Sequence, residues 1–177
     1  MAVASTAGAI LDTVAAGESF VVHVYVQDLR ALPKGVFASY FDLRYGSTLV
    51  AVSGAIDYGT DFPNGHRADA TTIGTIVDVG AFAGFTELGG GELRLVSVPF
   101  VALASGVADF VADTTNHSTG DDTLLYGLDN SVPLDQVHLL DASVQIGPRD
   151  EGESSGPSAF AAAADQIFAD EADWLLP

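Results

Sequence analysis

Residues 17–59 read GESFVVHVYVQDLRALPKGVFASYFDLRYGSTLVAVSGAIDYG, and their side chains change face with a period of two. From Glu18 to Asp28, one face of an extended chain carries four apolar side chains and the other face a more polar set: Phe20, Val22, Val24 and Val26 against Val21, His23, Tyr25 and Gln27. Successive side chains of a strand point to opposite sides, so this period predicts a half-buried β-strand. The stretch therefore indicates a β-sandwich.

A second segment, Phe37–Tyr45, repeats the alternation. Phe37, Phe41, Leu43 and Tyr45 share one parity, which only Ser39 interrupts, and the opposite parity carries Ala38, Tyr40, Asp42 and Arg44. Leu32–Gly35 lies between the two segments and combines a proline with a glycine, which favours a turn. We expect neighbouring strands of one sheet, with an exposed binding surface formed by Tyr25, Tyr40, Asp42 and Arg44.

Strand patterns recur along the rest of residues 1–147 and are separated by clusters of turn-forming residues, which predicts eight or nine strands. Within Glu92–Ala104, Pro99 lacks the N–H of a sheet ladder and indicates an edge strand or a bulge. We expect loops at Gly59–His66 and Asp113–Asp122, and a last strand at Val137–Ile146. No helical pattern interrupts the series, so the predicted fold is all-β, an antiparallel two-sheet sandwich.

The chain changes composition after residue 147. Residues 148–158 contain Gly, Ser, Pro and charged side chains, which is typical of a linker. Residues 159–177 carry an apolar stripe at helical spacing, on the same side as Glu171: Phe160, Ala164, Ile167, Phe168 and Leu175. We expect a short amphipathic helix, and the sequence leaves open whether it is a loosely docked tail, a partner-binding segment or a sorting segment.

The charge balance excludes several partners. The chain has 24 acidic and 6 basic residues, a formal net charge of -18, which repels phosphate backbones and anionic lipid headgroups. No apolar run reaches the roughly 18 residues of a membrane-spanning helix. The absence of cysteine excludes disulfides and thiolate metal sites. We therefore expect neither nucleic-acid binding nor membrane insertion.

The common catalytic signatures are missing, since the sequence has no G-x-S-x-G elbow, no H-E-x-x-H pair and no glycine-rich phosphate loop. The four histidines share no spacing that would place two of them on one helix or strand face: His23, His66, His117 and His138. We expect a protein that is not an enzyme and that requires no cofactor.

Calcium is the one ion that the acidic residues favour, because hard cations bind clusters of carboxylate and carbonyl oxygens. The densest cluster surrounds one polar loop and consists of Asp109, Asp113, Asp121 and Asp122. It departs from the EF-hand pattern, so two interpretations stay open: a calcium site, or carboxylates that cap turns.

Several segments, in order, resemble a cohesin domain: GESFVVHVYVQDL, GVFASYFDLRYG, TLVAVSG, GELRLVSVPFVALASGVADFVAD and ASVQIG. The resemblance covers Gly17 to Gly147, and its motif positions are Tyr45-Gly46, Leu49-Val50, Leu95, Val98, Phe100 and Ser105-Gly106. It is nearest to the divergent cohesin-like modules of large exported bacterial proteins, such as those of planctomycetes. It implies a nine-stranded jelly roll, related to carbohydrate-binding modules, in a family whose cellulosomal members bind a dockerin through one sheet face.

Three functions stay open on the sequence. The first is a protein-binding module whose partner is of dockerin type and is bound through an exposed sheet face. The second is a carbohydrate-binding module, in which exposed aromatic side chains such as Tyr25 and Tyr40 would stack on a polysaccharide. The third is a structural spacer or adhesion domain of a multidomain protein. The resemblance implies export to the cell surface or the exterior in each case.

Overall fold

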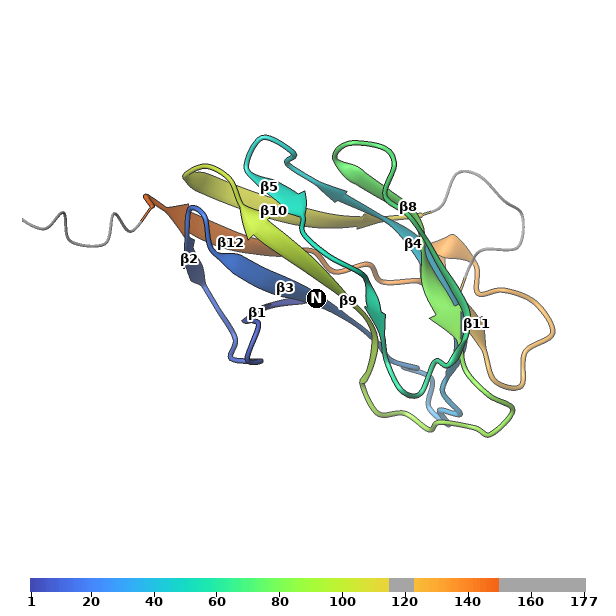
Figure 1. Ribbon diagram of the computed structural model, residues 1–177. Coiled ribbons are helices and arrows are strands. Elements are labelled where there is room, and N and C mark those ends of the chain that lie inside the picture. Colours follow the sequence, from blue (N-terminus) through green and yellow to red (C-terminus); the bar gives the residue numbers. More distant parts are fainter. Residues whose placement is uncertain (115–122, 150–177) are drawn as a thin grey trace, which may run out of the picture.

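Two β-sheets pack face to face in the computed structural model, which describes residues 1–114 and 123–149 (Figure 1). The expected helical tail and most of the expected linker lie outside these residues. Sheet A contains five strands, in the order β1, β3, β9 and β5, with β6 also paired to β9. Their bounds are Ala2–Ser5 (β1), Ser19–Val26 (β3), Leu93–Ala102 (β9), Val50–Val52 (β5) and Asp57–Tyr58 (β6).

Sheet B contains seven strands, in the order β2, β12, β10, β4, β8 and β7, with β11 also paired to β4. Their bounds are Thr13–Ala15 (β2), Ala142–Gly147 (β12), Gly106–Asp113 (β10), Val36–Tyr45 (β4), Thr75–Phe82 (β8), Asn64–Asp69 (β7) and Leu124–Leu125 (β11). A short 3₁₀ helix, η1, spans Leu134–Gln136. The pairs are antiparallel except for β12 with β2. The predicted all-β, two-sheet jelly-roll sandwich is confirmed, but the described residues form twelve strands and not the eight or nine expected, because several pairings involve short strands of two to four residues.

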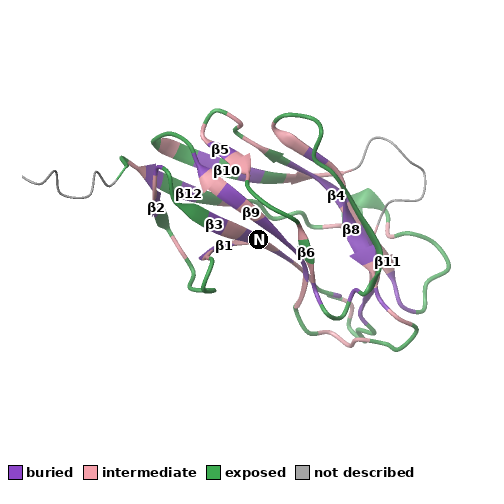
Figure 2. Ribbon diagram, in the orientation of Figure 1, coloured by how far each residue is buried: buried purple, intermediate pink, exposed green. Residues whose placement is uncertain are grey.

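Three phenylalanines from both sheets form the centre of the core. Phe20 of β3 stacks on Phe100 of β9 with ring centroids 5.9 Å apart, and Phe110 of β10 contacts both rings from the opposite sheet. All three side chains are fully buried, and burial of each contributes roughly 1.5–3 kcal/mol. Buried and exposed residues alternate along β10 and β12 (Figure 2), which is the period of two that the sequence shows.

The turn between β3 and β4 carries the chain from one sheet to the other. The buried Asp28 carboxylate accepts hydrogen bonds from the backbone N–H groups of Lys34, at 2.8 Å, and Gly35, at 3.0 Å. It also accepts one from the Arg30 guanidinium at 2.7 Å. These bonds hold the turn that joins β3 of sheet A to β4 of sheet B. The expectation that the two strands are neighbours in one sheet is wrong.

Pro99 lies inside a central strand and not at an edge, because β9 pairs with β3 on one side and with β5 and β6 on the other. Its carbonyl oxygen accepts the Ser53 N–H at 2.9 Å, in the gap between β5 and β6. The nitrogen and oxygen of one strand residue point to the same side, so the missing N–H faces that gap. The partner strand is interrupted where the proline cannot donate.

Two other predicted segments are corrected. The loop expected at Gly59–His66 ends earlier, because Asn64 begins β7, an exposed strand with two register shifts against β8. Its entry is held by His66, whose ring stacks on Tyr58 at 4.0 Å and whose Nε2 lies 2.8 Å from the Phe62 carbonyl oxygen. The last strand, expected from Val137, begins at Ala142, because residues 137–141 form no ladder.

Candidate functional site

One surface of the sandwich combines charged groups with exposed aliphatic side chains. We call it the outer face of sheet B, and it is formed by Tyr40, Arg44, Val107, Asp109, Val111, Asp113, Ser143 and Gln145. Cross-strand register places these side chains together, since Arg44 lies opposite Val111, Asp109 opposite Ser143, and Val107 opposite Gln145. Val107 is 54% exposed and Val111 is 38% exposed, although both are apolar.

An ion pair crosses the middle of this face. Nη2 of Arg44 lies 2.5 Å from Oδ2 of Asp113, and both side chains remain open to solvent, at 52% and 35% exposure. An exposed pair of this kind contributes little to stability. Arg44 therefore presents a positive charge beside the exposed Val111 on a strongly acidic protein.

Tyr40 lies at the β8 side of the same face and is half-buried. Its hydroxyl donates to the Gly65 carbonyl oxygen at 2.7 Å, and the guanidinium carbon of Arg67 lies 5.9 Å from the ring centroid. Gly80 lies opposite Tyr40, and a Cβ there would be 2.6 Å from Cδ1 of Tyr40 and would overlap the Ser39 carbonyl oxygen. The ring is thus held against the sheet, where a glycine leaves it room.

Asp42 does not belong to the exposed face, and this prediction is corrected. The residue is only 3% exposed, and its Oδ1 accepts the Asp78 N–H at 3.0 Å. Asp78 has a φ of 52°, and the pairing of β4 with β8 shifts between Phe41 and Leu43. Asp42 therefore stabilises a bulge in β8. Its carboxylate accepts a hydrogen bond from the Asp78 N–H at the point where the pairing of β4 with β8 is irregular.

Tyr25 lies in the other sheet, at the end of β3. Its ring makes an edge contact with His23 at 6.2 Å, and its register partner on β9 is Arg94. Tyr25 and Tyr40 therefore do not form the common surface that the sequence predicted. Consequently the two tyrosines form no flat aromatic row of the kind that stacks on successive sugar rings.

The predicted calcium cluster is only partly described. Asp109 and Asp113 share one face of β10 four residues apart, which is about 13 Å along a strand, too far to bind one ion together. Asp113 is paired with Arg44 and also accepts the Thr114 N–H. Asp121 and Asp122 lie outside the described residues. Within residues 1–114 and 123–149 no three His, Asp or Glu side chains gather as a metal site, and calcium binding stays a prediction.

His23 has a hydroxyl partner on the outer side of sheet A. Its Nδ1 lies 2.8 Å from Oγ of Ser97, the residue opposite on β9. Burial lowers the pKa of His23, and the positive charge of Arg94 lowers it further. The ring is therefore neutral near pH 7, and the contact is a cross-strand hydrogen bond between neutral groups.

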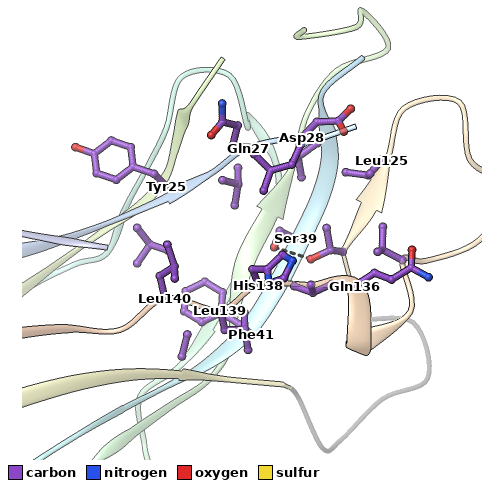
Figure 3. A pocket seen from close by; sticks show the side chains of 18 of the residues that line it. Tyr25, Gln27, Asp28, Ser39, Phe41, Leu125, Gln136, His138, Leu139 and Leu140 are labelled. Carbon is purple, nitrogen blue, oxygen red and sulfur yellow. Dashed lines mark hydrogen bonds between the residues drawn. The ribbon is translucent and has the colours of Figure 1, made fainter. Parts of the chain in front are cut away.

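A cavity that the sequence analysis did not predict opens where β3 ends. It has a volume of about 670 Å³ and lies between residues 24–30, the middle of β4 and the segment 123–140 (Figure 3). We call it the β3 cavity. Leu139, Leu140 and Phe41 lie on one side of it in Figure 3, and Tyr25 and Gln27 lie on the other. Its polar groups include Ser39, whose Oγ is 3.2 Å from Oγ1 of Thr123.

A search for helices that could cross a membrane finds none in the part of the chain that the structure describes. No protein-family model and no curated protein matches the sequence.

Solved structures do match. The chain is similar to a cohesin module from a family 33 glycoside hydrolase of Clostridium perfringens, with a TM-score of 0.55 and 14% identity over 78% of this chain and 92% of that one. A type I cohesin from Pseudobacteroides cellulosolvens gives a TM-score of 0.56 and 13% identity, over 80% and 90%. A chain of a type I cohesin–dockerin complex from Clostridium thermocellum gives 0.56 and 14%, over 77% and 94%.

These likenesses lie in fold, as identities near 14% imply, and each covers nine tenths or more of the known module. They agree with the all-β, two-sheet fold seen here. The described chain is a divergent cohesin-like domain in its fold.

Proposed function

We propose that this chain is a non-catalytic protein-binding module that binds its partner through the outer face of sheet B. The observation that carries the proposal is the mixed character of that face, where the exposed Val107 and Val111 lie beside the Arg44–Asp113 ion pair. Protein interfaces combine exposed apolar area with a few charged groups, and arginine and tyrosine are enriched in them. The open face of a sheet suits another protein better than a small ligand, because small-ligand sites are concave.

The first partner class to test is a dockerin-type module. The support is that one of the similar solved structures is a cohesin–dockerin complex. We further propose an extracellular or cell-surface location, because a net charge of -18 keeps a secreted domain soluble and repels anionic surfaces. Neither statement rests on a residue match, since the likeness is one of fold.

Carbohydrate binding is the weaker alternative. A sugar platform needs exposed aromatic rings in one plane, whereas Tyr40 is half-buried and hydrogen-bonded to Gly65, and Tyr25 belongs to the other sheet. If the wild-type chain bound a glycan on an array and the Tyr40→Ala variant did not, carbohydrate binding would become the favoured function. No binding, or binding that Tyr40→Ala leaves intact, would remove Tyr40 from it.

The proposal is tested by capture of partners on the immobilised full chain. We would use a panel of dockerin modules together with the exported proteins of the source organism, in calcium and in a chelator. We expect specific retention of a protein by the wild-type chain and its loss in the Arg44→Glu/Val111→Glu variant. The Leu103→Glu variant is the matched control, because Leu103 is 47% exposed and lies in the turn after β9. The proposal would be contradicted if no protein were retained specifically, or if all three chains retained the same protein equally.

A further inference from the structure

The β3 cavity and the apolar stripe of residues 159–177 take no part in the proposed function. The cavity walls are largely apolar and include Val24, Val26, Phe41, Leu125 and Leu139. Volumes of this size are typical of sites that bind a ligand or a side-chain cluster. The cavity therefore has room for several large side chains from outside the described residues.

The rim of the cavity is unusually rich in exposed leucine. Leu29 and Leu140 are each 70% exposed, Leu134 is 54% exposed and Leu128 is 42% exposed. These side chains come from two segments distant in the sequence, the turn after β3 and the region around η1. Apolar groups gathered at one opening in this way mark a surface that another apolar element covers.

We infer that residues 159–177 of the same chain occupy the β3 cavity, with their apolar stripe facing its walls. The stripe contains Phe160, Ile167, Phe168 and Leu175 at helical spacing, and Trp174 falls within the same arc. A short helix in isolation is marginal in water and gains its stability from packing an apolar face. The cavity supplies such a packing surface.

The linker is long enough for this arrangement. Arg149, the last described residue, lies beside Gly17, where an added Cβ would be 3.2 Å from the Arg149 Nε. Gly17 precedes β3, and the cavity lies at the other end of that strand, about 25 Å away at the usual rise per residue. Residues 150–158 reach at most about 30 Å when extended. The linker must be nearly extended to span this distance, so tethering raises the effective concentration of the segment less than a linker of matched length would.

Charge limits how tightly the segment binds. Residues 150–177 contain seven acidic side chains and no basic one, and the rest of the chain is acidic too. Apolar contact must therefore carry the docking against repulsion. Among the residues lining the cavity, Arg30 is the one Lys or Arg, and its guanidinium is already paired with Asp28, so it offers Glu171 of the stripe little compensation. Salt screens the general repulsion, so docking should strengthen as ionic strength rises.

Trp174 is the only tryptophan of the chain, so its fluorescence in the full-length protein reports docking directly. We expect wild-type emission to be blue-shifted from that of the urea-unfolded chain, protected from acrylamide quenching and independent of protein concentration. The Leu134→Gln/Leu140→Gln variant should shift emission to the red and lose the protection. The control is Leu103→Gln, an exposed leucine at the far end of β9, which should behave as wild type.

Three results would overturn the inference. Wild-type emission equal to that of the unfolded chain would show that the segment is undocked. Equal effects of the cavity variant and the Leu103→Gln control, or no effect of either, would show that it docks elsewhere. A blue shift that disappears on dilution would show that a second copy supplies the segment. Circular dichroism of each variant checks that the sandwich is intact, and none of these outcomes depends on the proposed partner.

Discussion

The outer face of sheet B and the β3 cavity differ in shape and chemistry, although strands of the same alternating pattern build both. The outer face is the open side of a sheet and places Arg44 and Asp113 among exposed valines. The β3 cavity is concave and has apolar walls with exposed leucines at its rim. The comparison teaches that the alternation determines which residues are buried, whereas the connections between strands determine what the surfaces can bind.

The turn that Asp28 organises creates this difference. It leads into β4 of the second sheet, where Arg44 lies on the outer face and Tyr40 borders both the outer face and the cavity, while Tyr25 stays beside the cavity. Perturbing the turn should therefore affect both regions, and changes within one region should leave the other intact.

The largest effect is expected from Asp28→Ala. The change removes the acceptor for the N–H groups of Lys34 and Gly35 and the partner of Arg30. Asp28 is fully buried whereas Arg30 is 31% exposed, so the main cost comes from the two backbone N–H groups left without an acceptor, about 1–3 kcal/mol for each one that stays buried. Chemical denaturation should show such a loss, against little change in Asp12→Ala, an exposed aspartate. A loss below about 1 kcal/mol would mean that the turn is held by other contacts.

Acid should reproduce part of that loss. The Arg30 hydrogen bond lowers the pKa of Asp28 well below its usual range, burial opposes the shift, and the Gly35, Arg30 and Lys34 N–H groups lower the pKa further. Because the folded-state pKa is depressed, the contribution is fully present above the unfolded pKa of about 3.9 and is lost as pH falls below it. The stability difference between wild type and Asp28→Asn should stay constant from about pH 7 to 5 and then shrink. A stability difference between the two chains that does not change with pH would contradict this expectation.

Gly80→Ala should have a smaller effect, confined to the outer face of sheet B. The added methyl group meets the Ser39 carbonyl oxygen and the Tyr40 ring, and overpacking of this kind costs about 1–3 kcal/mol. Gly84→Ala is the matched control, since a Cβ there has no neighbour within 4 Å. Thermal unfolding of both variants measures the contrast. Equal melting temperatures would show that β8 moves aside without cost.

Arg44→Ala should change stability least. Its ion pair with Asp113 is exposed on both sides, and such pairs contribute about 0.2–1 kcal/mol, less at high salt. Urea denaturation at low and high salt would check this. A loss above about 2 kcal/mol would mean that Arg44 holds the sheet together and is not free to serve a partner.

The sequence predicted the core of the sandwich well, for a clear physical reason. Phe20, Val22 and Val24 are buried by the opposite sheet, whereas the residues between them are not. The alternation of apolar and polar residues is therefore enough to predict which side chains form the core. Ser39 is instructive because it interrupts the apolar parity of β4. It lines the β3 cavity and its Oγ contacts Oγ1 of Thr123. A polar residue at an inward position of β4 is therefore a sequence feature that could have indicated the cavity.

Other features depend on contacts between distant segments, which alternation does not encode. Asp42 has the parity of an exposed residue, but the bulge at Asp78 gives its carboxylate a backbone donor and buries it. The separation of β3 from β4 depends on Asp28, which in the sequence is only the last residue of a strand. Pro99 indicated an edge strand or a bulge. Its actual place, beside a gap in the neighbouring strand, becomes visible only in the assembled sheet.

The central claim is that the outer face of sheet B binds the protein partner. The most direct test is a calorimetric titration of the protein retained in the capture experiment, a dockerin module or another protein, into wild-type, Val111→Glu and Leu103→Glu chains. The account predicts at least about tenfold weaker binding for Val111→Glu, the effect of losing one central contact, and wild-type binding for Leu103→Glu. Wild-type affinity in Val111→Glu, or an equal loss in both variants, would contradict it.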